Sequence, residues 1–305
     1  MDTQWIIDTM ETWSPKKWAM ANDNVGLQVG DRTKKVSRIL TALDLTESVI
    51  EEAVQNKFDF IVTHHPLISR HVPPVNSITT DNVLGKKIIT LIANGIGHFC
   101  AHTNLDVAPQ GVNELLFELL QLKNQKPLLE PTDPPDGRAG PPDGRAGPPD
   151  GRAGPPDGRA GPPDGRAGLG YPTLGLVGDF GEGVLLPHFA KHVATVLNLP
   201  NIRYVGSEDS LVKKVAICGG SGGNSQLLQA AISQQCDTYV TGDIGHHFAL
   251  EAAESGISLI DGTHYATEVQ ISLAIANHLT VAAQKQGLEV LVEVSRVQMP
   301  VFRSL

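Results

Sequence analysis

Cysteine is scarce in this sequence of 305 residues, which contains only Cys100, Cys218 and Cys236. The number is odd, the surroundings are apolar, and no two cysteines have CxxC spacing. These features exclude a disulfide framework as the element that organises the fold. We therefore expect three reduced thiols in the core.

Long apolar runs and an excess of positive charge are also missing. No run reaches the roughly 18 residues needed to span a bilayer, and the N-terminal segment, with Asp2, Asp8 and Glu11, lacks the basic start of a secretory signal. A formal net charge of −9, with lysines only in scattered pairs, disfavours a nucleic-acid-binding surface. We expect a cytoplasmic protein with no membrane and no nucleic-acid partner.

One segment is unlike the rest of the chain. From Pro134 to Gly168 the heptapeptide Pro-Pro-Asp-Gly-Arg-Ala-Gly occurs five times without a substitution. It carries no net charge, and its proline and glycine content disfavours helices and strands alike. The composition predicts a disordered loop at 134–168, with function elsewhere. A proline-rich docking site would need PxxP spacing, which the repeat does not contain.

Outside the repeat, strand and helix patterns alternate, which predicts an α/β fold of two lobes. We expect the first lobe at 1–125, completed by 262–305, and the second at 169–261. In the first lobe we expect helices at 3–13, 47–56 and 82–93, and strands at 36–43, 58–63 and 96–101. In the second we expect strands at 174–178, 213–218, 238–241 and 258–261, with helices at 186–197 and 225–234. A helix at 266–284 and a strand at 289–294 close the chain.

Four of the strand-like runs end in histidines or carboxylates. Ligands in α/β sheets collect beyond the carboxyl ends of strands, so these four ends are expected to converge, in the cleft between the lobes. The runs lead into His64-His65-Pro66, into His102 to Asp106, into Gly242-Asp243 with His246-His247, and into His264 with Glu268.

The spacing of these residues indicates a metal site. Pro66 favours an extended His65, and neighbours in an extended chain point to opposite sides, so His64 and His65 would serve two ions. His264 and Glu268 are four residues apart at the start of a helix, which places both on one face. Asp106 would complete a set of three imidazoles and two carboxylates. We expect two divalent ions, zinc first, with manganese, iron, cobalt or nickel as alternatives.

Each residue also has a simpler interpretation. A His-His-Pro segment is often only a turn, and Glu268 could be an acid favoured by the helix dipole. His102 and His247 could be core side chains, or could lie behind the ligands and orient a water or protonate a leaving group. The shared position of all the candidates at strand ends favours the metal site.

A different catalytic motif competes with the metal site. Residues 219–223 read Gly-Gly-Ser-Gly-Gly between an expected strand and an expected helix, which fits the nucleophile elbow of a serine hydrolase with Ser221 as nucleophile. The same glycines fit a loop whose amides bind an anion at a helix N-terminus. A serine triad leaves His64, His65 and Asp106 without a role.

The ordered motifs closely resemble the Ngg-interacting-factor-three-like dinuclear metal proteins, many of which carry the label GTP cyclohydrolase I type 2 homologue. The resemblance rests on 23–30, Thr63 to Pro66, His102 to Asp106, 242–247 and His264 to Glu268, and it spans the chain except the repeat. It implies that His64, His65, Asp106, His264 and Glu268 are the metal ligands, with Glu268 as the bridge, and that the protein is a toroidal homohexamer. Thr263 departs from the family, which usually has glycine before this histidine.

These observations predict a dinuclear metal-dependent hydrolase of a small molecule, with a GTP cyclohydrolase-like activity on a nucleotide as the implication of the family label. We expect His65, Asp106 and Glu268 on one ion and His64, His264 and Glu268 on the other, or the same division with the two histidines swapped. His102 and His247 are the candidate catalytic residues. The alternatives are a non-enzymatic metal-handling or scaffold ring and a serine hydrolase that uses Ser221.

Overall fold

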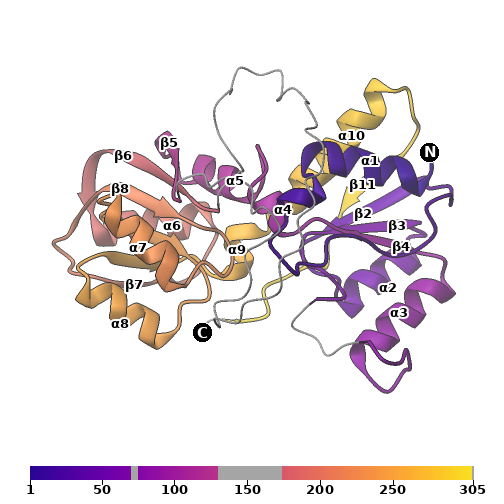
Figure 1. Ribbon diagram of the computed structural model, residues 1–305, viewed down its shortest axis with the longest axis horizontal. Coiled ribbons are helices and arrows are strands. Elements are labelled where there is room, and N and C mark those ends of the chain that lie inside the picture. The colour runs from indigo at the N-terminus through magenta and orange to yellow at the C-terminus, as the bar shows by residue number, and fades with distance from the viewer. Residues whose placement is uncertain (70–74, 130–173, 304–305) are drawn as a thin grey trace, which may run out of the picture.

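A five-stranded sheet forms the centre of the first lobe in the computed structural model, which describes residues 1–69, 75–129 and 174–303 (Figure 1). Its strand order is β1-β4-β3-β2-β11, and β2, β3, β4 and β11 are parallel while β1 is antiparallel to β4. The strands are β1 (Gly26–Val29), β2 (Arg38–Ala42), β3 (Phe60–Thr63), β4 (Gly97–Cys100) and β11 (Leu291–Val294).

Helices cover both faces of this sheet. One face packs against α1 (Thr3–Trp13) and α10 (Ile271–Lys285), and the other against α2 (Glu47–Gln55) and α3 (Val83–Ala93). The strands β3 and β4 are buried along their whole length, as expected of a parallel sheet covered on two sides. The result is a three-layer lobe with one apolar core on each face of the sheet.

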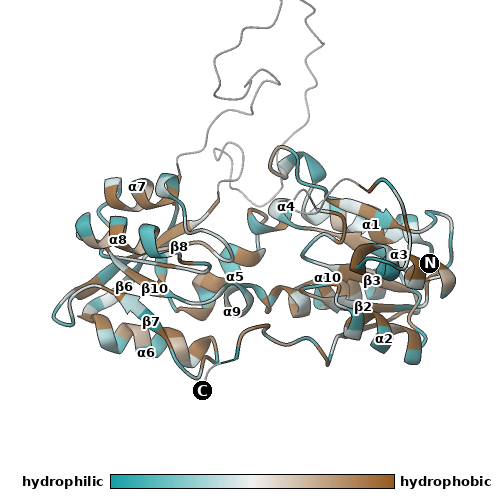
Figure 2. Cartoon of the chain, turned by 90° about the horizontal axis from the view of Figure 1, so that it is seen from below, coloured by the Kyte–Doolittle hydropathy of each residue, from teal (hydrophilic) through white to brown (hydrophobic). Residues whose placement is uncertain are grey.

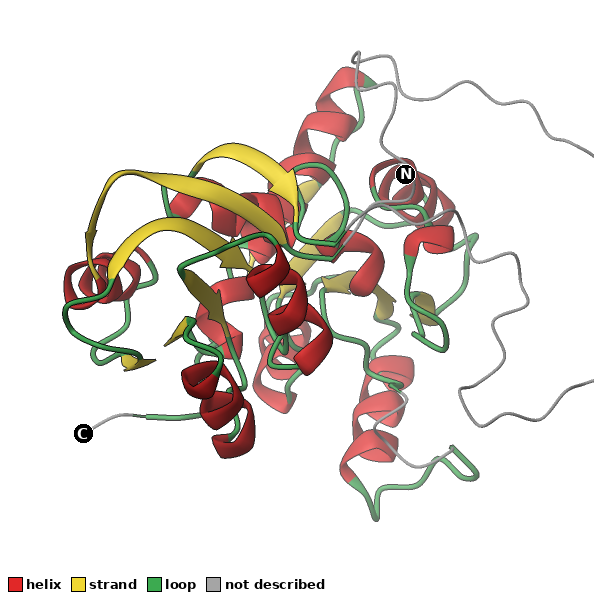
Figure 3. Cartoon of the chain, turned by 60° about the vertical axis from the view of Figure 1, so that its left-hand side comes forward, coloured by secondary structure: helices red, strands yellow, loops and turns green. Residues whose placement is uncertain are grey.

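The second lobe repeats this arrangement around six strands (Figure 3). The strand order is β5-β6-β8-β9-β10-β7, with β8, β9 and β10 parallel at its centre. One face packs against α6 (Leu186–Val196) and the other against α7 (Ser225–Ser233) and α8 (His246–Glu254). The strands are β5 (Lys123–Pro127), β6 (Leu176–Leu185), β7 (Arg203–Val205), β8 (Leu211–Ile217), β9 (Thr238–Thr241) and β10 (Ser258–Asp261).

Short elements join the two lobes. The 3-10 helix η1 (Lys16–Trp18) contacts α4 (Thr103–Asp106), and α4 leads into α5 (Val112–Leu119). On the return path, α9 (His264–Glu268) follows β10 and contacts α5. The chain therefore passes through the region between the sheets with α4 and again with α9.

Local sequence explains where several helices begin. The side chains of Thr46, Asn82 and Asn224 accept hydrogen bonds from backbone N–H groups in the first turns of α2, α3 and α7. Such N-caps satisfy donors that the helix itself leaves unpaired, and each typically stabilises the fold by about 1 kcal/mol. These caps fix the starts of three helices within a residue or two of the expected positions.

The two-lobed α/β architecture predicted from the sequence is confirmed. The strand β11 pairs with β2, so the chain does return to the first sheet. The expected division at residue 125 falls inside β5, which belongs wholly to the second sheet. The single closing helix expected at 266–284 is wrong, because α9 and α10 are separate helices. No sequence pattern predicted α5 or α8, and the repeat at 134–168 lies outside the described residues.

The strand directions determine what lies between the lobes. The segments that follow β2, β3 and β4 lie at one edge of the first sheet, and those that follow β9 and β10 lie at one edge of the second. Residues from all five segments line one cavity. No helix among the described residues is long and apolar enough to cross a membrane.

Candidate metal centre

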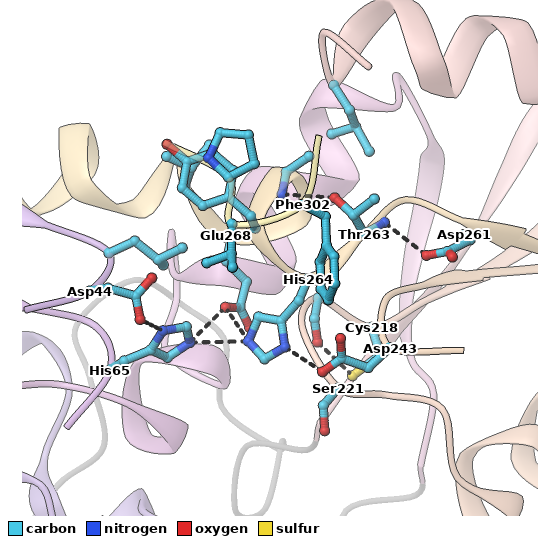
Figure 4. Close-up of a pocket in the computed structure, with 18 of the residues that line it drawn as sticks. Asp44, His65, Cys218, Ser221, Asp243, Asp261, Thr263, His264, Glu268 and Phe302 are labelled. Carbon is cyan, nitrogen blue, oxygen red and sulfur yellow. Dashed lines mark hydrogen bonds and ion pairs between the residues drawn. The ribbon is translucent and has the colours of Figure 1, made fainter. Parts of the chain in front are cut away.

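The cavity between the lobes has a volume of about 1420 Å³ and contains a cluster of histidines and carboxylates (Figure 4). His64 and His65 follow β3, Asp106 ends α4, and His264 and Glu268 are the first and last residues of α9. The structure thus brings together all five residues expected to bind metal.

His64 and Asp106 form one half of the cluster, within the first lobe. The His64 imidazole is completely buried, and its Nδ1 donates a hydrogen bond to the Ala101 carbonyl at 2.9 Å. Its Nε2 lies 3.3 Å from Asp106 Oδ1 and 3.8 Å from Glu268 Oε1. Neither His64 Nε2 nor Asp106 Oδ1 makes a hydrogen bond of normal geometry, although both are buried. Two buried polar atoms therefore face each other without a partner.

His65 and His264 form the other half, across the cleft. His65 Nδ1 donates to Asp44 Oδ1 at 2.8 Å, and His264 Nδ1 donates to Asp243 Oδ2 at 2.7 Å (Figure 4). The two Nε2 atoms lie 3.1 Å apart, and each lies 3.0 Å from Glu268 Oε2. Two N–H groups cannot point at each other over this distance, so at least one of the two Nε2 atoms presents its lone pair to the other.

Glu268 lies between the two halves. Its side chain is only 5% exposed, with Oε1 toward His64 and Oε2 toward His65 and His264. Burial alone would raise its pKa, but interactions with the three imidazoles hold the pKa of this carboxyl well below its ordinary value. Glu268 is therefore an ionised group with one oxygen directed to each half.

The chemistry of these donors fits divalent metal ions. In all three histidines Nδ1 is held by an oxygen acceptor, which fixes the neutral tautomer with the Nε2 lone pair directed into the cluster. Metal-bound histidines are oriented in this way by an acceptor behind the ring. Among the described residues, His64, Asp106 and Glu268 form one group able to hold an ion, and His65, His264 and Glu268 form another. A third group combines His64 and His65 with His102 and contains no carboxylate. Imidazole and carboxylate donors suit zinc, manganese, iron, cobalt and nickel.

Protonation supplies the positive charge when no metal does. Burial by itself lowers the pKa of His65, but hydrogen bonds to Asp44 and Glu268 raise it to about 10. In the same way, burial lowers the pKa of His264 while Glu268 raises it, to about 9 overall. Burial, and then the charge of Glu268, raise the pKa of Asp106 to about 7. In the absence of metal ions, the cluster therefore binds protons strongly.

A further histidine lies beside the cluster. His102 Nδ1 donates to both oxygens of Asp23, at 3.0 and 2.9 Å, and the ring centroid of His102 lies 5.2 Å from that of His64. Thr103 also donates to Asp23 through its hydroxyl at 2.6 Å. Asp23 thus fixes the His102 ring with Nε2 as the atom available to a ligand, and both residues line the cavity.

Comparison with known proteins agrees with this fold. A model of the family Duf34/NIF3 (NGG1p interacting factor 3) matches residues 1–300. The chain belongs to the Duf34/NIF3 family. The resemblance seen in the sequence motifs is therefore confirmed.

Individual Duf34/NIF3 proteins match over nearly the whole chain. A Clostridium perfringens protein named GTP cyclohydrolase 1 type 2 homolog is 32% identical over 275 residues, which cover 89% of this chain and 88% of the relative. The crystal structure of a Bacillus cereus protein related to NIF3 superposes with a TM-score of 0.83 at 28% identity and covers 100% of this chain and 99% of that one. A Staphylococcus aureus structure gives a TM-score of 0.81 at 28% identity, with the same coverage.

Of the two divisions of the ligands that the sequence allows, the structure of this Duf34/NIF3 chain favours the swapped one. His65 with Asp106 and His64 with His264 was the first expectation, but the structure groups His64 with Asp106 and His65 with His264. The reason is that adjacent side chains at the end of β3 do diverge, and His64 is the one that points into its own lobe, where Asp106 lies. His65 points across the cleft to the second lobe.

The two candidate catalytic histidines have different positions. His102 lines the cavity beside the cluster, whereas His247 is exposed on α8 and meets the His246 ring edge to face at a centroid distance of 5.4 Å. His247 is not among the residues that line the cavity. Its expected catalytic role therefore receives no support from the described part of the chain.

The glycine-rich loop 219–223 forms a wall of the site. A Cβ atom at Gly220, where φ is +63°, would lie 1.9 Å from Glu268 Oε1. Ser221 lines the cavity, but both ring nitrogens of His264 are already occupied, by Asp243 and by the cluster. His264 cannot then serve Ser221 as a base, and α7 begins only at Ser225 rather than directly after the serine. The geometry therefore does not support the nucleophile elbow. The role of the loop is instead to let its backbone pass close to the Glu268 carboxylate.

The sequence patterns did not predict which carboxylates lie behind the imidazoles. Asp44, Asp23 and Asp243 orient His65, His102 and His264 respectively. Asp44 follows β2 in the way the ligands follow their strands, so the strand-end pattern could have identified it. Asp23 and Asp243 stand in the motifs that carry the family resemblance, but only the fold shows which histidine each one orients.

Proposed function

We propose that this protein is a metal-dependent hydrolase of a small molecule, with two divalent ions held by His64, His65, Asp106, His264 and Glu268. The observation that carries the proposal is the convergence of three lone pairs of Nε2 atoms on two buried carboxylates, with every Nδ1 held from behind. Such a set has no evident structural use, since burying it without cations is unfavourable. Glu268 is proposed as the shared ligand.

The ions would supply Lewis acidity, polarising a substrate oxygen and lowering the pKa of water toward neutrality. The chain itself supplies position and proton transfer. Asp23 fixes the His102 ring, so Nε2 of His102 can hold or release a proton at the cavity side of the cluster. The buried walls of the cluster exclude bulk water, which strengthens every charge interaction inside.

The relatives point to a substrate class. Several are named GTP cyclohydrolase 1 type 2 homolog, and this name suggests hydrolysis of a nucleotide for the present chain. A fold shared with these proteins does not by itself select the substrate. We therefore include nucleotides in the proposal as the first compounds to test.

Metal content gives the first test. Purified protein should contain about two divalent ions per chain by elemental analysis, and Glu268→Gln should reduce the content of both, because this residue faces both groups. His264→Ala should remove mainly one ion. Glu254→Gln and His188→Ala change exposed residues outside the cavity and should leave the metal content unchanged. Full occupancy in the Glu268 variant would contradict the shared-ligand assignment.

Turnover gives the second test. A panel of nucleotides, esters and amides should include a compound hydrolysed by the metal-loaded protein, and a chelator should abolish that activity. Ser221→Ala should retain it, whereas His102→Ala should lower kcat by about 10²-fold, the typical contribution of a positioned acid or base. A fully metal-loaded protein that hydrolyses nothing in the panel would favour a metal-handling role, and inhibition by a serine-directed reagent would favour Ser221.

A further inference from the structure

The cavity extends well beyond the metal-binding cluster. Its volume of about 1420 Å³ exceeds the range of roughly 300–1,000 Å³ typical of small-molecule sites, and four of the five candidate ligands, all except His64, line it. A further part of its wall, here called the distal end, is formed by 197–203 of the second lobe, apart from Ile202, and by 300–303. Nothing in the proposed chemistry yet uses the distal end.

Residues 295–303, here called the crossing segment, run from β11 across the cleft toward α6 of the second lobe (Figure 2). Two hydrogen bonds to the first lobe hold its start. Glu52 accepts a hydrogen bond from the Arg296 backbone N–H at 3.0 Å, and Gln298 Oε1 accepts from the Leu43 backbone N–H at 2.9 Å. Leu43 itself lines the cavity. The segment is therefore fixed to the wall of the cavity four residues before Phe302.

Phe302 and Val301 contribute apolar side chains to the wall of this cavity, and these side chains are exposed to solvent. Both line the distal end, yet Phe302 is 90% and Val301 is 89% exposed. Figure 4 shows Phe302 among the lining side chains together with Thr263 and His264. An exposed phenyl ring at the mouth of a cavity favours a ligand that covers it, and rings prefer flat partners that stack or meet edge to face.

Positive charge is also concentrated at the distal end. Arg203 and Arg303 are the only lysine or arginine residues among the described residues that line the cavity. Arg203 bonds to the buried Asp261 through one nitrogen, and a guanidinium carries five N–H donors, so donors remain on its exposed side. In a chain of net charge −9, two guanidinium groups that line the same cavity as an exposed ring are suited to an anion that carries a ring.

We propose that the distal end binds a planar aromatic group bearing a negative charge, with Phe302 as the specificity-determining residue. This inference rests on the proposed function, because the aromatic group would be part of the substrate. The bond to be hydrolysed in the same substrate would lie at the metal-binding cluster. Phe302 covers one face of the ring, and Arg203 and Arg303 bind its anionic substituent.

Two probes of equal charge test the site without any turnover. Naphthalene-1-sulfonate carries a flat ring, and butane-1-sulfonate carries a flexible chain, while a sulfonate is a weak metal ligand. Calorimetry or saturation-transfer NMR on the full chain should show about tenfold tighter binding of the aromatic probe. Phe302→Ala should remove most of that preference, and Phe302→Tyr should retain it. Arg303→Gln should weaken both probes by a similar factor, about threefold.

The control is Ile92→Ala, which truncates an apolar side chain that is 61% exposed on α3, away from the cavity, and should change neither probe. Equal binding of the two probes by the unmodified chain would overturn the inference. The inference would also be overturned if Phe302→Ala kept the preference for the aromatic probe. It would be overturned too if that variant bound both probes as before and only its oligomeric mass changed. Metal content, measured on the same samples, is a separate result: a metal-free chain that prefers the aromatic probe contradicts only the proposed function. A metal-loaded chain without this preference contradicts only the distal site.

Discussion

Thr263 adopts a backbone conformation that residues other than glycine rarely accept. Its φ of 58° and ψ of 150° lie in a region that is almost restricted to glycine, directly before His264. Its hydroxyl accepts a hydrogen bond from the Ala266 N–H, which caps α9. The backbone at Thr263, where the family resemblance implies glycine, is thus strained, and this strained residue directly precedes the candidate ligand His264.

We expect Thr263→Gly to stabilise the protein. The substitution relieves about 1–3 kcal/mol of backbone strain. Loss of the helix cap costs only about a few tenths of a kcal/mol, and the greater freedom of glycine in the unfolded chain costs about 0.5–1 kcal/mol. Calorimetry should show the melting temperature rising by a few degrees. Lys57→Gly, at a residue with φ of 56° outside the cavity, is the control for a positive φ alone and should give a smaller gain. A lower melting temperature for the Thr263 variant would show that its side chain contributes more than its backbone costs.

His98 should make the fold sensitive to acid. It is completely buried, its Nε2 donates to Thr63 Oγ1 at 2.8 Å, and its Nδ1 has no hydrogen-bond partner. The Thr63 hydroxyl donates its own proton to the His65 carbonyl, so this hydroxyl can only accept from His98. Burial, with a smaller effect of Lys87, lowers the pKa of His98 to about 3. Protonation would create a buried cation without a partner.

The sign of the pH effect follows from the two pKa values. Between the unfolded value of 6.5 and about 3, the unfolded chain binds a proton that the folded chain does not, so stability falls as pH falls. His98→Leu should remove about 2 kcal/mol of the stability loss between pH 7 and pH 5, measured by urea unfolding at the two values. His188→Ala, at an exposed histidine, should leave the loss unchanged. Equal losses in the His98 variant and the unmodified chain would mean that His98 does not become protonated on unfolding.

At the scale of elements, the loop 219–223 and α9 are fitted to each other. Gly220 approaches the Glu268 carboxylate too closely for any side chain, and the Gly220 N–H donates to Thr267 Oγ1 at 2.9 Å. The loop and α9 meet only in the folded state, since they are more than forty residues apart in the sequence. Their contact keeps Glu268 buried between the two groups of candidate ligands.

Gly220→Ala should therefore lower both stability and metal content. The added Cβ would displace Glu268, and the positive φ costs a further 1–2 kcal/mol or so. Gly256→Ala separates the two effects, because φ is +76° there while no atom lies within 4 Å of the added Cβ. Elemental analysis should show normal metal content for Gly256→Ala and a reduced content for Gly220→Ala. Normal content in both would place Glu268 outside the metal-binding groups.

At the scale of the whole molecule, the candidate site joins the two lobes. His64, His65 and Asp106 come from the first lobe, whereas α9, with His264 and Glu268, leads back from the last parallel strand of the second sheet. A cation bound by residues from both sides would hold the lobes together and stabilise the folded state by mass action. The site is thus coupled to the relative position of the lobes.

We expect the protein to assemble as the homohexamer that the family resemblance implies. Six chains of 32.6 kDa correspond to a mass of about 196 kDa, which light scattering coupled to gel filtration would measure. A second, smaller hollow between α5 and α10 is lined in part by Leu115, Leu119 and Leu273. The Leu273 side chain is half exposed. Leu273→Glu should reduce the mass if this face joins subunits. A mass of one chain at micromolar concentration would contradict the ring.

The sequence by itself determined the alternation of strands and helices, the two lobes and the identity of the clustered side chains. Local rules suffice for these features: caps start helices, buried apolar runs form central strands, and parallel strands present their carboxyl ends at one edge. A ligand at the end of a strand is therefore visible before the fold is known.

The tertiary structure alone decided how these side chains are grouped. Which of two adjacent histidines points inward depends on the twist and register of β3 against its neighbours, so His64 met Asp106 and His65 met His264. Asp44 acquired its role only when β2 and β3 paired, and His247 was separated from the cluster when α8 turned its side chain to solvent. Phe302 reached the cavity because the crossing segment spans the cleft. Contacts between residues far apart in the chain depend on packing in three dimensions, which no local pattern encodes.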